Sequence, residues 1–325
     1  MAGLLERFNG LRALVIGDVM IDVYSEGVID RMSPEAPVPI VNIKKRFARM
    51  GGAANVALNL KALGATPILC SVIGNDENSE MLIKLMEQSG LDTGYFAMSQ
   101  IRCTTVKHRI FNGDKQVLRM DVENTDDLTE EEHEDLLNVI KEAMFKKHYD
   151  VVILQDYNKG VLTEKMIHAI LALAKEKGIP VAVDPKKKNF FAYQGVTLFK
   201  PNVKELREGL GVTAETLDEL KLAMFNLQQR LQCEYLMVTL SEKGVMILHE
   251  DRFIHLPAHP RNIVDVSGAG DTVLSVAALC VAQREDPHVI AALSNLAGGL
   301  VCEEVGVVPI NKERLTVEAQ RISHE

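Results

Sequence analysis

The feature that most constrains the fold is an alternation of short apolar runs with helix-length segments in the second half of the chain. Mostly apolar runs stand at 151–154, 196–199 and 236–240, and a segment capped by Thr163 and ended by Gly178 separates the first two. Strands that are apolar throughout are buried on both faces, and their alternation with helices favours a mainly parallel sheet. The sequence therefore predicts an α/β fold with helices covering both faces of one sheet.

The length and charge of the chain narrow the class of protein. We expect a single domain over residues 1–325, because no repeat, low-complexity segment or obvious linker interrupts the pattern. The chain has 36 Lys+Arg and 45 Asp+Glu, a net charge of −9. An acidic chain without a basic run is a poor candidate for non-specific nucleic-acid binding.

The spacing of the cysteines and the length of the apolar segments indicate the cellular compartment of the protein. The five cysteines are scattered without a CxxC pair, which predicts reduced thiols and disfavours a disulfide or zinc framework. The N-terminus shows no apolar signal segment, and the most apolar run, 273–282, is too short to span a bilayer. We therefore expect a cytoplasmic protein that makes no membrane contact.

A glycine-rich turn opens a predicted helix in the C-terminal part of the chain. Gly268, Ala269 and Gly270 precede Asp271, and apolar residues follow at helical spacing. The first amides of a helix lack an internal partner and favour an anion, so residues 268–271 can form an anion hole for a phosphoryl group. Asp271 beside them can take a proton from an attacking hydroxyl. The pattern favours phosphoryl transfer, and a plain turn with a helix-capping acid is the other interpretation.

Polar and small residues with possible ligand roles also stand in the N-terminal part. Asp18 and Asp22 follow the first predicted strand, where open α/β sheets bind ligands, so both can hydrogen-bond hydroxyl groups. The alternative is that they are loop acids without a partner. Gly51 and Gly52 open a predicted helix and let the backbone approach a ligand, with Asn55 one turn further on. A small-residue helix packed tightly on a sheet explains the same pattern.

Two segments break the alternation of strands and helices. Residues 31–40 contain three prolines, which exclude a helix and disfavour a central strand, so we expect a stiff extended arm. Residues 102–122 alternate as strands do about a turn at Gly113 and Asp114, which predicts a hairpin. We expect the regions of about 22–48 and 102–122 to form a small β lid that excludes water from the site.

Cationic side chains gather in the predicted lid and at predicted strand ends. They are Arg31, Lys107, Arg109, Arg119, Lys159 and Lys186. Arginine binds phosphate through two parallel hydrogen bonds, so the pattern favours a substrate that already carries a phosphate. Solvated charges on an edge hairpin are the alternative.

Three segments, in order along the chain, resemble the ribokinase-like carbohydrate kinases. They are the glycine pair with Asn55, residues 202–205, and residues 265–271. The resemblance covers essentially Arg12 to Pro309. It implies a ribokinase-like three-layer sandwich with a small β lid, and an ATP- and Mg²⁺-dependent kinase that phosphorylates an alcohol group.

Further segments resemble one branch of these kinases. They are residues 17–22, 33–39, 51–57, 156–160 and 184–186. The branch is the D-glycero-β-D-manno-heptose-7-phosphate kinases, the kinase half of the bifunctional enzyme of ADP-heptose synthesis. It implies phosphorylation of the anomeric O1 hydroxyl to the 1,7-bisphosphate, on the route to the lipopolysaccharide core. Nothing up to Glu325 resembles the nucleotidyltransferase half, so we expect a stand-alone kinase or an isolated kinase domain.

The resemblance also implies a role for individual positions. Asp271 becomes the general base and Gly268–Gly270 the anion hole. The residues expected to hold the sugar phosphate are Asp18, Asp22, Gly51, Gly52, Asn55, Asp156, Asp184 and the six cations named above. Those expected along the nucleotide are Asn202, Lys204, Glu205, Thr239, Ser241, Gly244 and Asn295, together with Gly268 and Gly270. Asn202 and Glu205 would hold Mg²⁺ through water, and Asp265 matches a position that binds a monovalent cation such as K⁺ in many relatives.

Other functions remain open at this point. A ribokinase-like kinase for another sugar fits the same motifs. A regulator that binds a nucleotide or sugar without catalysis is disfavoured, because Asp271, Glu205 and both glycine motifs are present. An NAD-dependent dehydrogenase is disfavoured, because no GxGxxG follows the first strand. Since the lids of relatives often pair between subunits, we expect a homodimer formed through the lid.

Overall fold

A nine-stranded sheet forms the centre of the computed structural model, which describes residues 2–322. Its strand order is β13-β12-β11-β10-β9-β8-β1-β4-β5, and neighbours from β11 to β5 are parallel, whereas β12 and β13 are antiparallel at one edge. The strands are β1 (Arg12–Gly17), β4 (Thr66–Gly74), β5 (Phe96–Ser99), β8 (Val151–Gln155), β9 (Val181–Asp184), β10 (Leu198–Phe199), β11 (Tyr235–Thr239), β12 (Val245–His249) and β13 (Arg252–Leu256). The predicted mainly parallel sheet is confirmed.

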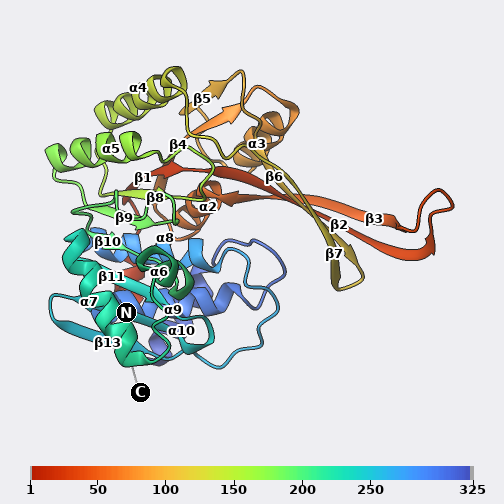
Figure 1. Cartoon of the computed structure of the whole chain (residues 1–325). Helices are drawn as coiled ribbons and strands as arrows, with labels where there is room; N and C mark the ends of the chain where they lie inside the picture. The colour runs from red at the N-terminus through yellow and green to blue at the C-terminus, as the bar shows by residue number, and fades with distance from the viewer. Residues whose placement is uncertain (1, 323–325) are drawn as a thin grey trace.

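Helices cover both faces of this sheet and complete a three-layer sandwich (Figure 1). One face carries α1 (Ala2–Arg7), α2 (Ala53–Ala62), α3 (Glu77–Gln88), α8 (Ala269–Ala282), α9 (Pro287–Val301) and α10 (Lys312–Ile322). The other carries α4 (Glu130–Lys146), α5 (Glu164–Lys177), α6 (Val203–Leu210) and α7 (Leu217–Leu231). A short 3₁₀ helix, η1 (Ser241–Lys243), precedes β12. Within residues 2–322, no helix combines the length and apolarity needed to cross a membrane.

The strand sequences explain why the sheet is buried on both faces. Along β1, Ala13 and Val15 enter one hydrophobic cluster and Leu14 and Ile16 the other, as expected when successive side chains point to opposite faces. The helices are delimited by their caps. For example, the Thr163 side chain accepts a hydrogen bond from the third amide of α5.

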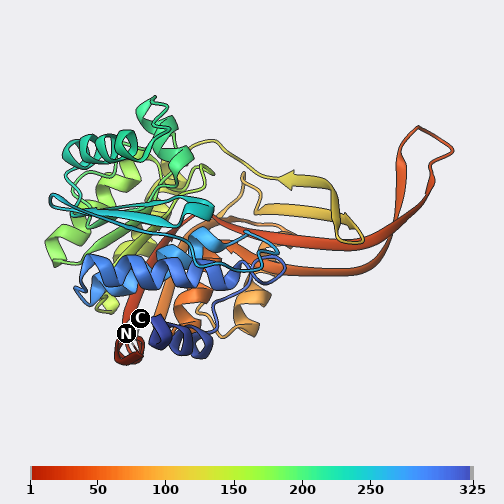
Figure 2. The same ribbon diagram turned by 90° about the horizontal axis from the view of Figure 1, so that it is seen from below.

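A second sheet of four strands, in the order β3-β2-β6-β7, projects from the sandwich (Figures 1 and 2). Its strands are β2 (Val19–Met32), β3 (Pro39–Gly52), β6 (Thr105–Asn112) and β7 (Lys115–Val122). The smaller sheet was predicted, including the turn at Gly113, whose φ is 58°. The proline-rich segment differs from the extended arm that we expected, because residues 33–38 form the loop at the tip of a long β2–β3 hairpin. Prolines are tolerated there because a loop needs no ladder amides.

Several elements were not predicted. They are α1, α6, α10, η1, β5 and β13, and the strand expected over 196–199 is only the two residues of β10. The edge strand β13 is short and partly exposed, so its sequence carries little of the apolar continuity that marks the central strands.

Candidate active site

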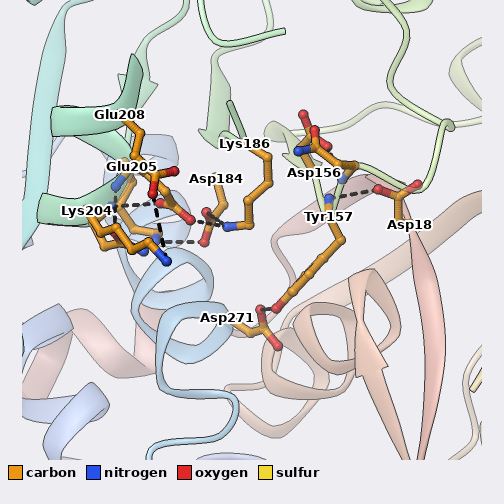
Figure 3. Close-up of polar contacts among 12 residues, drawn as sticks. Asp18, Asp156, Tyr157, Asp184, Lys186, Lys204, Glu205, Glu208 and Asp271 are labelled. Carbon is orange, nitrogen blue, oxygen red and sulfur yellow. Dashed lines mark hydrogen bonds and ion pairs between the residues drawn. The ribbon is translucent and has the colours of Figure 1, made fainter. Parts of the chain in front are cut away.

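The candidate site lies where the parallel strands β1, β8, β9, β10 and β11 end and helix α8 begins (Figure 3). Carboxyl ends of parallel strands share one edge of the sheet, which brings together residues that are far apart in sequence. Segments after these strands and the first turns of α2, α6 and α8 supply the site residues.

The glycine-rich turn starts α8 in the way the sequence predicts. Gly268 is the residue before the helix and has a φ of 81°, a left-handed conformation that glycine adopts without strain. Within the described residues, the amides of Gly268, Gly270 and Asp271 have no hydrogen-bond partner. The amide of Ala269 differs from our expectation, because it donates to the carbonyl of Val266 at 3.3 Å. Three of the four expected amides are therefore available to an anion at this helix terminus.

Asp271 is buried at the start of α8, and each of its carboxylate oxygens has one donor. The Asn55 amide donates to Oδ2 at 2.8 Å, and the Tyr157 hydroxyl donates to Oδ1 at 2.7 Å (Figure 3). Burial raises the pKa of Asp271 to about 6, while these two hydrogen bonds act in the opposite direction. The carboxylate is thus largely ionised at neutral pH, as a general base must be.

The glycine pair before α2 is required by close contacts. A Cβ on Gly51 would lie 2.2 Å from the Asp22 carboxylate, and one on Gly52 would lie 2.4 Å from the carbonyl oxygen of Asp18. Gly52 also has a φ of 60°. Glycine at both positions therefore allows β2 to lie close to the start of α2, from which Asn55 reaches Asp271.

Asp18 holds a loop together, and its contact with ligand hydroxyls stays a prediction. It is 1 % exposed, and its carboxylate accepts hydrogen bonds from the amides of Tyr157, Lys159 and Val161 at 2.7, 3.1 and 3.2 Å. Burial raises the pKa of Asp18, and the three amides oppose that shift. With its oxygens occupied by backbone donors, Asp18 shapes the loop after β8.

Asp156 has a similar structural environment. It is buried, and its carboxylate accepts from the amide of Asn158 at 2.7 Å and from the hydroxyl of Tyr193 at 2.8 Å. Burial and the nearby Asp18 raise the pKa of Asp156 to about 6. These two donors fix the carboxylate in place, and its contact with the substrate stays a prediction.

Asp22 faces the lid cations. Its carboxylate forms an ion pair with Arg109, and the β2–β6 register sets Asp22 opposite Lys107. Lys107 Nζ lies 5.2 Å from the centroid of the Tyr157 ring. Burial lowers the pKa of Lys107; Asp22 opposes this effect, and the neighbouring cations Lys159 and Arg109 add to it. Like charges are thus held close together beside Asp22.

The remaining predicted cations are distributed unevenly. Lys159 pairs with Glu123 at 2.7 Å, and Arg119 pairs with Asp121 at 2.9 Å on the same face of the lid as Arg109. Arg31 does not join the site within this chain. It is exposed near the hairpin tip, about 30 Å along β2 from Asp22 at about 3.3 Å per residue.

A second charged cluster lies at the ends of β9 and β10. Asp184 forms ion pairs with Lys200 at 2.8 Å and with Lys186 at 3.3 Å (Figure 3). Lys186 also forms an ion pair with Glu205. Burial opposes ionisation of Asp184, but the two lysines hold its pKa below the usual range. Asp184 and Glu205 together raise the pKa of Lys186 against the effect of its burial. A Cβ on Gly270 would lie 3.7 Å from Asp184, so the cluster adjoins the helix terminus.

Most of the residues predicted to contact the nucleotide lie near the start of α6 and the end of β11. Asn202 and Glu205 form a capping box, each side chain bonded to the other's backbone amide at 2.8 Å. Thr239 bridges to Asn202, whereas Lys204 is 80 % exposed and faces Glu208 at 3.8 Å. The other predicted residues are Ser241, at the edge of a hollow of ≈ 560 Å³, Gly244, with φ 88°, and Asn295, whose amide donates to Pro257 at 2.8 Å.

Asp265 joins the glycine-rich turn to the segment before α10. Its carboxylate accepts from the amides of Ser267 at 2.9 Å and Gly306 at 2.8 Å. Arg49 at the base of the lid donates to the carbonyls of Val305 and Val307 in the same segment. The lid base and the turn before α8 are therefore connected through residues 305–307.

Sequence reasoning missed two residues that the structure brings into the site. Tyr157 donates to Asp271, and the buried Lys200 pairs with Asp184. Both stand close after a predicted strand, Tyr157 after 151–154 and Lys200 after 196–199. Only their position after a strand could have identified them as site residues. A tyrosine or lysine at such a position often has a purely structural role.

Comparisons with known proteins agree with this architecture. The family described as pfkB family carbohydrate kinase matches residues 11–314. The bifunctional protein HldE of Methylobacillus flagellatus is 41% identical over 307 residues, which cover 94% of this chain and 63% of that protein. HldE of Mesorhizobium japonicum is 37% identical over 312 residues, covering 96% and 62%. The chain thus spans less than two thirds of the length of these relatives.

Solved structures of kinases share the fold. Phosphofructokinase-2 from Escherichia coli, in complex with potassium, superposes with a TM-score of 0.78 at 16% identity, over 96% of this chain and 100% of that one. Ribokinase from Arabidopsis thaliana, complexed with ribose and ATP, gives 0.73 at 16% identity, over 94% and 99%. The ribokinase-like fold is therefore confirmed. The family match over residues 11–314, nearly the whole sequence, shows that this chain belongs to the pfkB family of carbohydrate kinases, enzymes that transfer phosphate to an alcohol group.

Proposed function

We propose that this kinase transfers the γ-phosphoryl group of ATP to O1 of D-glycero-β-D-manno-heptose 7-phosphate, with Asp271 as the general base. The observation that carries the proposal is a buried carboxylate, with a pKa of about 6, beside three helix N-terminal amides that have no partner among residues 2–322. The segments that resemble heptose-phosphate kinases support the choice of sugar.

The reaction needs one proton acceptor and one anion-stabilising group. The O1 proton passes to Asp271, O1 bonds to the γ-phosphorus, and the bond from phosphorus to the β–γ bridging oxygen breaks to release ADP. The amides of Gly268, Gly270 and Asp271 favour the negative charge on the transferring group. An anomeric hydroxyl is more acidic than an ordinary alcohol, so an aspartate suffices in a loose transition state.

The oxygen donors at the ends of β9 and β10 fit Mg²⁺ bound through water. The Glu205 carboxylate already contacts Lys186 and the Asn202 amide, and Asp184 contacts two lysines. These contacts favour water between the carboxylates and the metal, whose preferred ligands are oxygen atoms. When bound, Mg²⁺ neutralises phosphate charge. K⁺ at Asp265 stays a prediction, tested by the K⁺ dependence of the rate.

The cations around Asp22 support a substrate that carries a phosphate. Lys107 has no carboxylate within 4.0 Å among the described residues, whereas Lys159 and Arg109 are paired. Burial and like charges disfavour its ammonium group, and an anionic ligand would relieve both effects. We therefore propose that Lys107 contacts the 7-phosphate, with Arg109 and Lys159 nearby.

We further propose that two copies pair through the lid. Alternate residues of β7, Leu118, Met120 and Val122, are 51, 44 and 48 % exposed on the face opposite to Arg119 and Asp121. A row of exposed apolar side chains on a projecting sheet favours a protein partner.

The five cysteines are free thiols, which supports a reducing cytoplasmic location.

The proposal is tested by a substrate panel. Heptose 7-phosphate, fructose 6-phosphate, ribose and adenosine are each offered with Mg-ATP, and the new phosphate is located by phosphorus NMR. We expect the highest kcat/KM for the heptose, with the phosphate on O1. Faster turnover of ribose or adenosine refutes the substrate assignment. The lid cations would then be interpreted as solvated surface charges. No turnover of any sugar refutes the proposed reaction.

A further inference from the structure

Tyr157 spans the space between two buried carboxylates. Its backbone amide donates to Asp18 at 2.7 Å, and its hydroxyl donates to Asp271 at 2.7 Å (Figure 3). Asp18 also accepts from the amides of Lys159 and Val161, so the backbone on the C-terminal side of Tyr157 is fixed as well. The hydroxyl therefore reaches Asp271 from a loop that is itself held in place.

The Tyr157 ring is also held from two elements outside its loop. Lys107 on lid strand β6 and Lys186 after β9 each place their Nζ 5.2 Å from the ring centroid. Cations at this distance from an aromatic face are attracted to it. The orientation of the ring thus depends on the lid and on the cluster beside Glu205.

We propose that Tyr157 is a positioning residue for the general base, because its hydroxyl fixes the orientation of the Asp271 carboxylate and favours the ionised form. The inference rests on the proposed function, since it requires that Asp271 accept the substrate proton. Asn55 holds one carboxylate oxygen and Tyr157 the other, so two donors on different elements fix the carboxylate plane. A donor to a carboxylate stabilises the ionised form relative to the protonated one.

The charged groups around Asp271 allow the sign of the effect to be stated. Burial raises its pKa, hydrogen bonds from Asn55 and Tyr157 lower it, Asp184 raises it and Lys200 lowers it. Removal of the Tyr157 hydroxyl leaves the other four influences in place. The pKa of Asp271 must then rise.

Tyr157 itself keeps its proton where Asp271 titrates. Burial and the carboxylates of Asp271, Asp184 and Asp22 raise the pKa of the phenol well above its usual range, although Lys107 and Lys186 face its ring. The hydroxyl is therefore a donor throughout the pH range in which a base of pKa about 6 changes its charge.

The test is the pH profile of the Tyr157→Phe protein with Mg-ATP and heptose 7-phosphate. We expect the acid limb of kcat/KM to move up by roughly one pH unit, as one hydrogen bond to a charged group implies. We also expect kcat to fall about tenfold at neutral pH with KM for ATP unchanged, because base orientation matters in the chemical step. An acid limb that stays in place overturns the proposal.

Tyr193→Phe is the matched control. It removes the same kind of bond, a buried tyrosine hydroxyl donating to a buried carboxylate, but the acceptor is Asp156. We expect this variant to leave the acid limb in place. An equal shift in both variants would show a general effect of loosening the loop and would overturn the proposal.

Two further measurements apply even if the Tyr157→Phe protein folds poorly. They also separate the hypothesis that Asp271 is the base from the hypothesis that Tyr157 positions it. Site-specific 3-fluorotyrosine at 157 is a stronger donor, so we expect the acid limb to move down. Carboxyl ¹³C NMR of the free protein follows the Asp271 pKa without any sugar, and we expect the same two shifts. If Asp271→Asn keeps wild-type turnover, the proposed base fails. If that variant is inactive while neither change at 157 moves the Asp271 pKa, only the role of Tyr157 fails.

Discussion

The side-chain amide of Asn55 donates a 2.8 Å hydrogen bond to the Asp271 carboxylate, across 216 residues of sequence. Asn59, one turn further along α2, accepts a hydrogen bond from the hydroxyl of Thr272, the residue after Asp271. These contacts fasten the start of α8 to α2. The carboxylate at the junction is therefore both a candidate base and part of a buried helix contact, so a change at Asp271 should alter chemistry and stability together.

Replacement of the base should abolish most activity without loss of ligand binding. We expect Asp271→Asn to lower kcat by about 10²–10⁴, the usual cost of removing a general base. The amide keeps a similar shape, so affinities for ATP and the sugar phosphate should stay within a few-fold, as measured by calorimetry. Wild-type kcat in this variant would mean that Asp271 only caps the helix.

The same variant should be more stable than wild type at neutral pH. Burial raises the folded-state pKa of Asp271 to about 6, whereas an unfolded aspartate titrates near 3.9. The stability that the protonated form contributes is fully present below about pH 4 and is lost as pH rises through about 6. The loss is on the order of 3 kcal/mol.

Asp271→Asn removes this loss because an amide carries no charge. Its oxygen can accept from Asn55 and its nitrogen can donate to the Tyr157 oxygen. Urea unfolding at pH 4 to 8 should therefore show a stability advantage of the variant at pH 7–8 that shrinks toward pH 4. A variant less stable than wild type at pH 8 would contradict the inferred burial cost.

Glu205 should set the Mg²⁺ requirement. We expect Glu205→Gln to raise the Mg²⁺ concentration that gives half-maximal activity, because a neutral amide attracts a hydrated cation less. Glu208→Gln is a suitable control, since Glu208 lies on the same helix and faces the exposed Lys204 at 3.8 Å. An unchanged Mg²⁺ dependence for Glu205→Gln removes this residue from the metal site.

Lys107 should matter for the substrate phosphate and little for ATP. A charged hydrogen bond contributes about 1.5–3 kcal/mol, so Lys107→Met should raise KM for the sugar phosphate by roughly 10- to 100-fold. Lys146→Met on α4 is the control, because that lysine is exposed and paired with Glu142. Steady-state kinetics with each substrate varied in turn makes the comparison. Equal losses for both substrates would argue against a phosphate contact at Lys107.

The lid face of β7 should control association. We expect Met120→Glu to shift the protein toward the monomer in sedimentation velocity, because it introduces a charge among exposed apolar side chains. Phe145→Glu on α4 is the matched control, since Phe145 is 88 % exposed but lies outside the lid. A wild-type protein that sediments as a monomer with full activity would rule out the lid dimer.

The sequence by itself determined the fold class, the smaller sheet and the positions of both glycine motifs. The central strands are mostly apolar, as strands of a sheet buried on both faces are. Gly52 and Gly268 have positive φ values, and this local backbone demand is visible as glycine in the sequence. Such features depend on residues close together in the chain, so sequence patterns report them.

Only the tertiary structure decided which charged groups pair. Asp18 and Asp22 looked alike in sequence, yet three backbone amides occupy Asp18 while Arg109 from the lid pairs with Asp22. Tyr157 reaches Asp271 across 114 residues. Such pairs depend on how distant segments pack against one another. The free energy of that packing comes from the whole hydrophobic core. The sequence around a polar residue therefore does not show which partner it will meet.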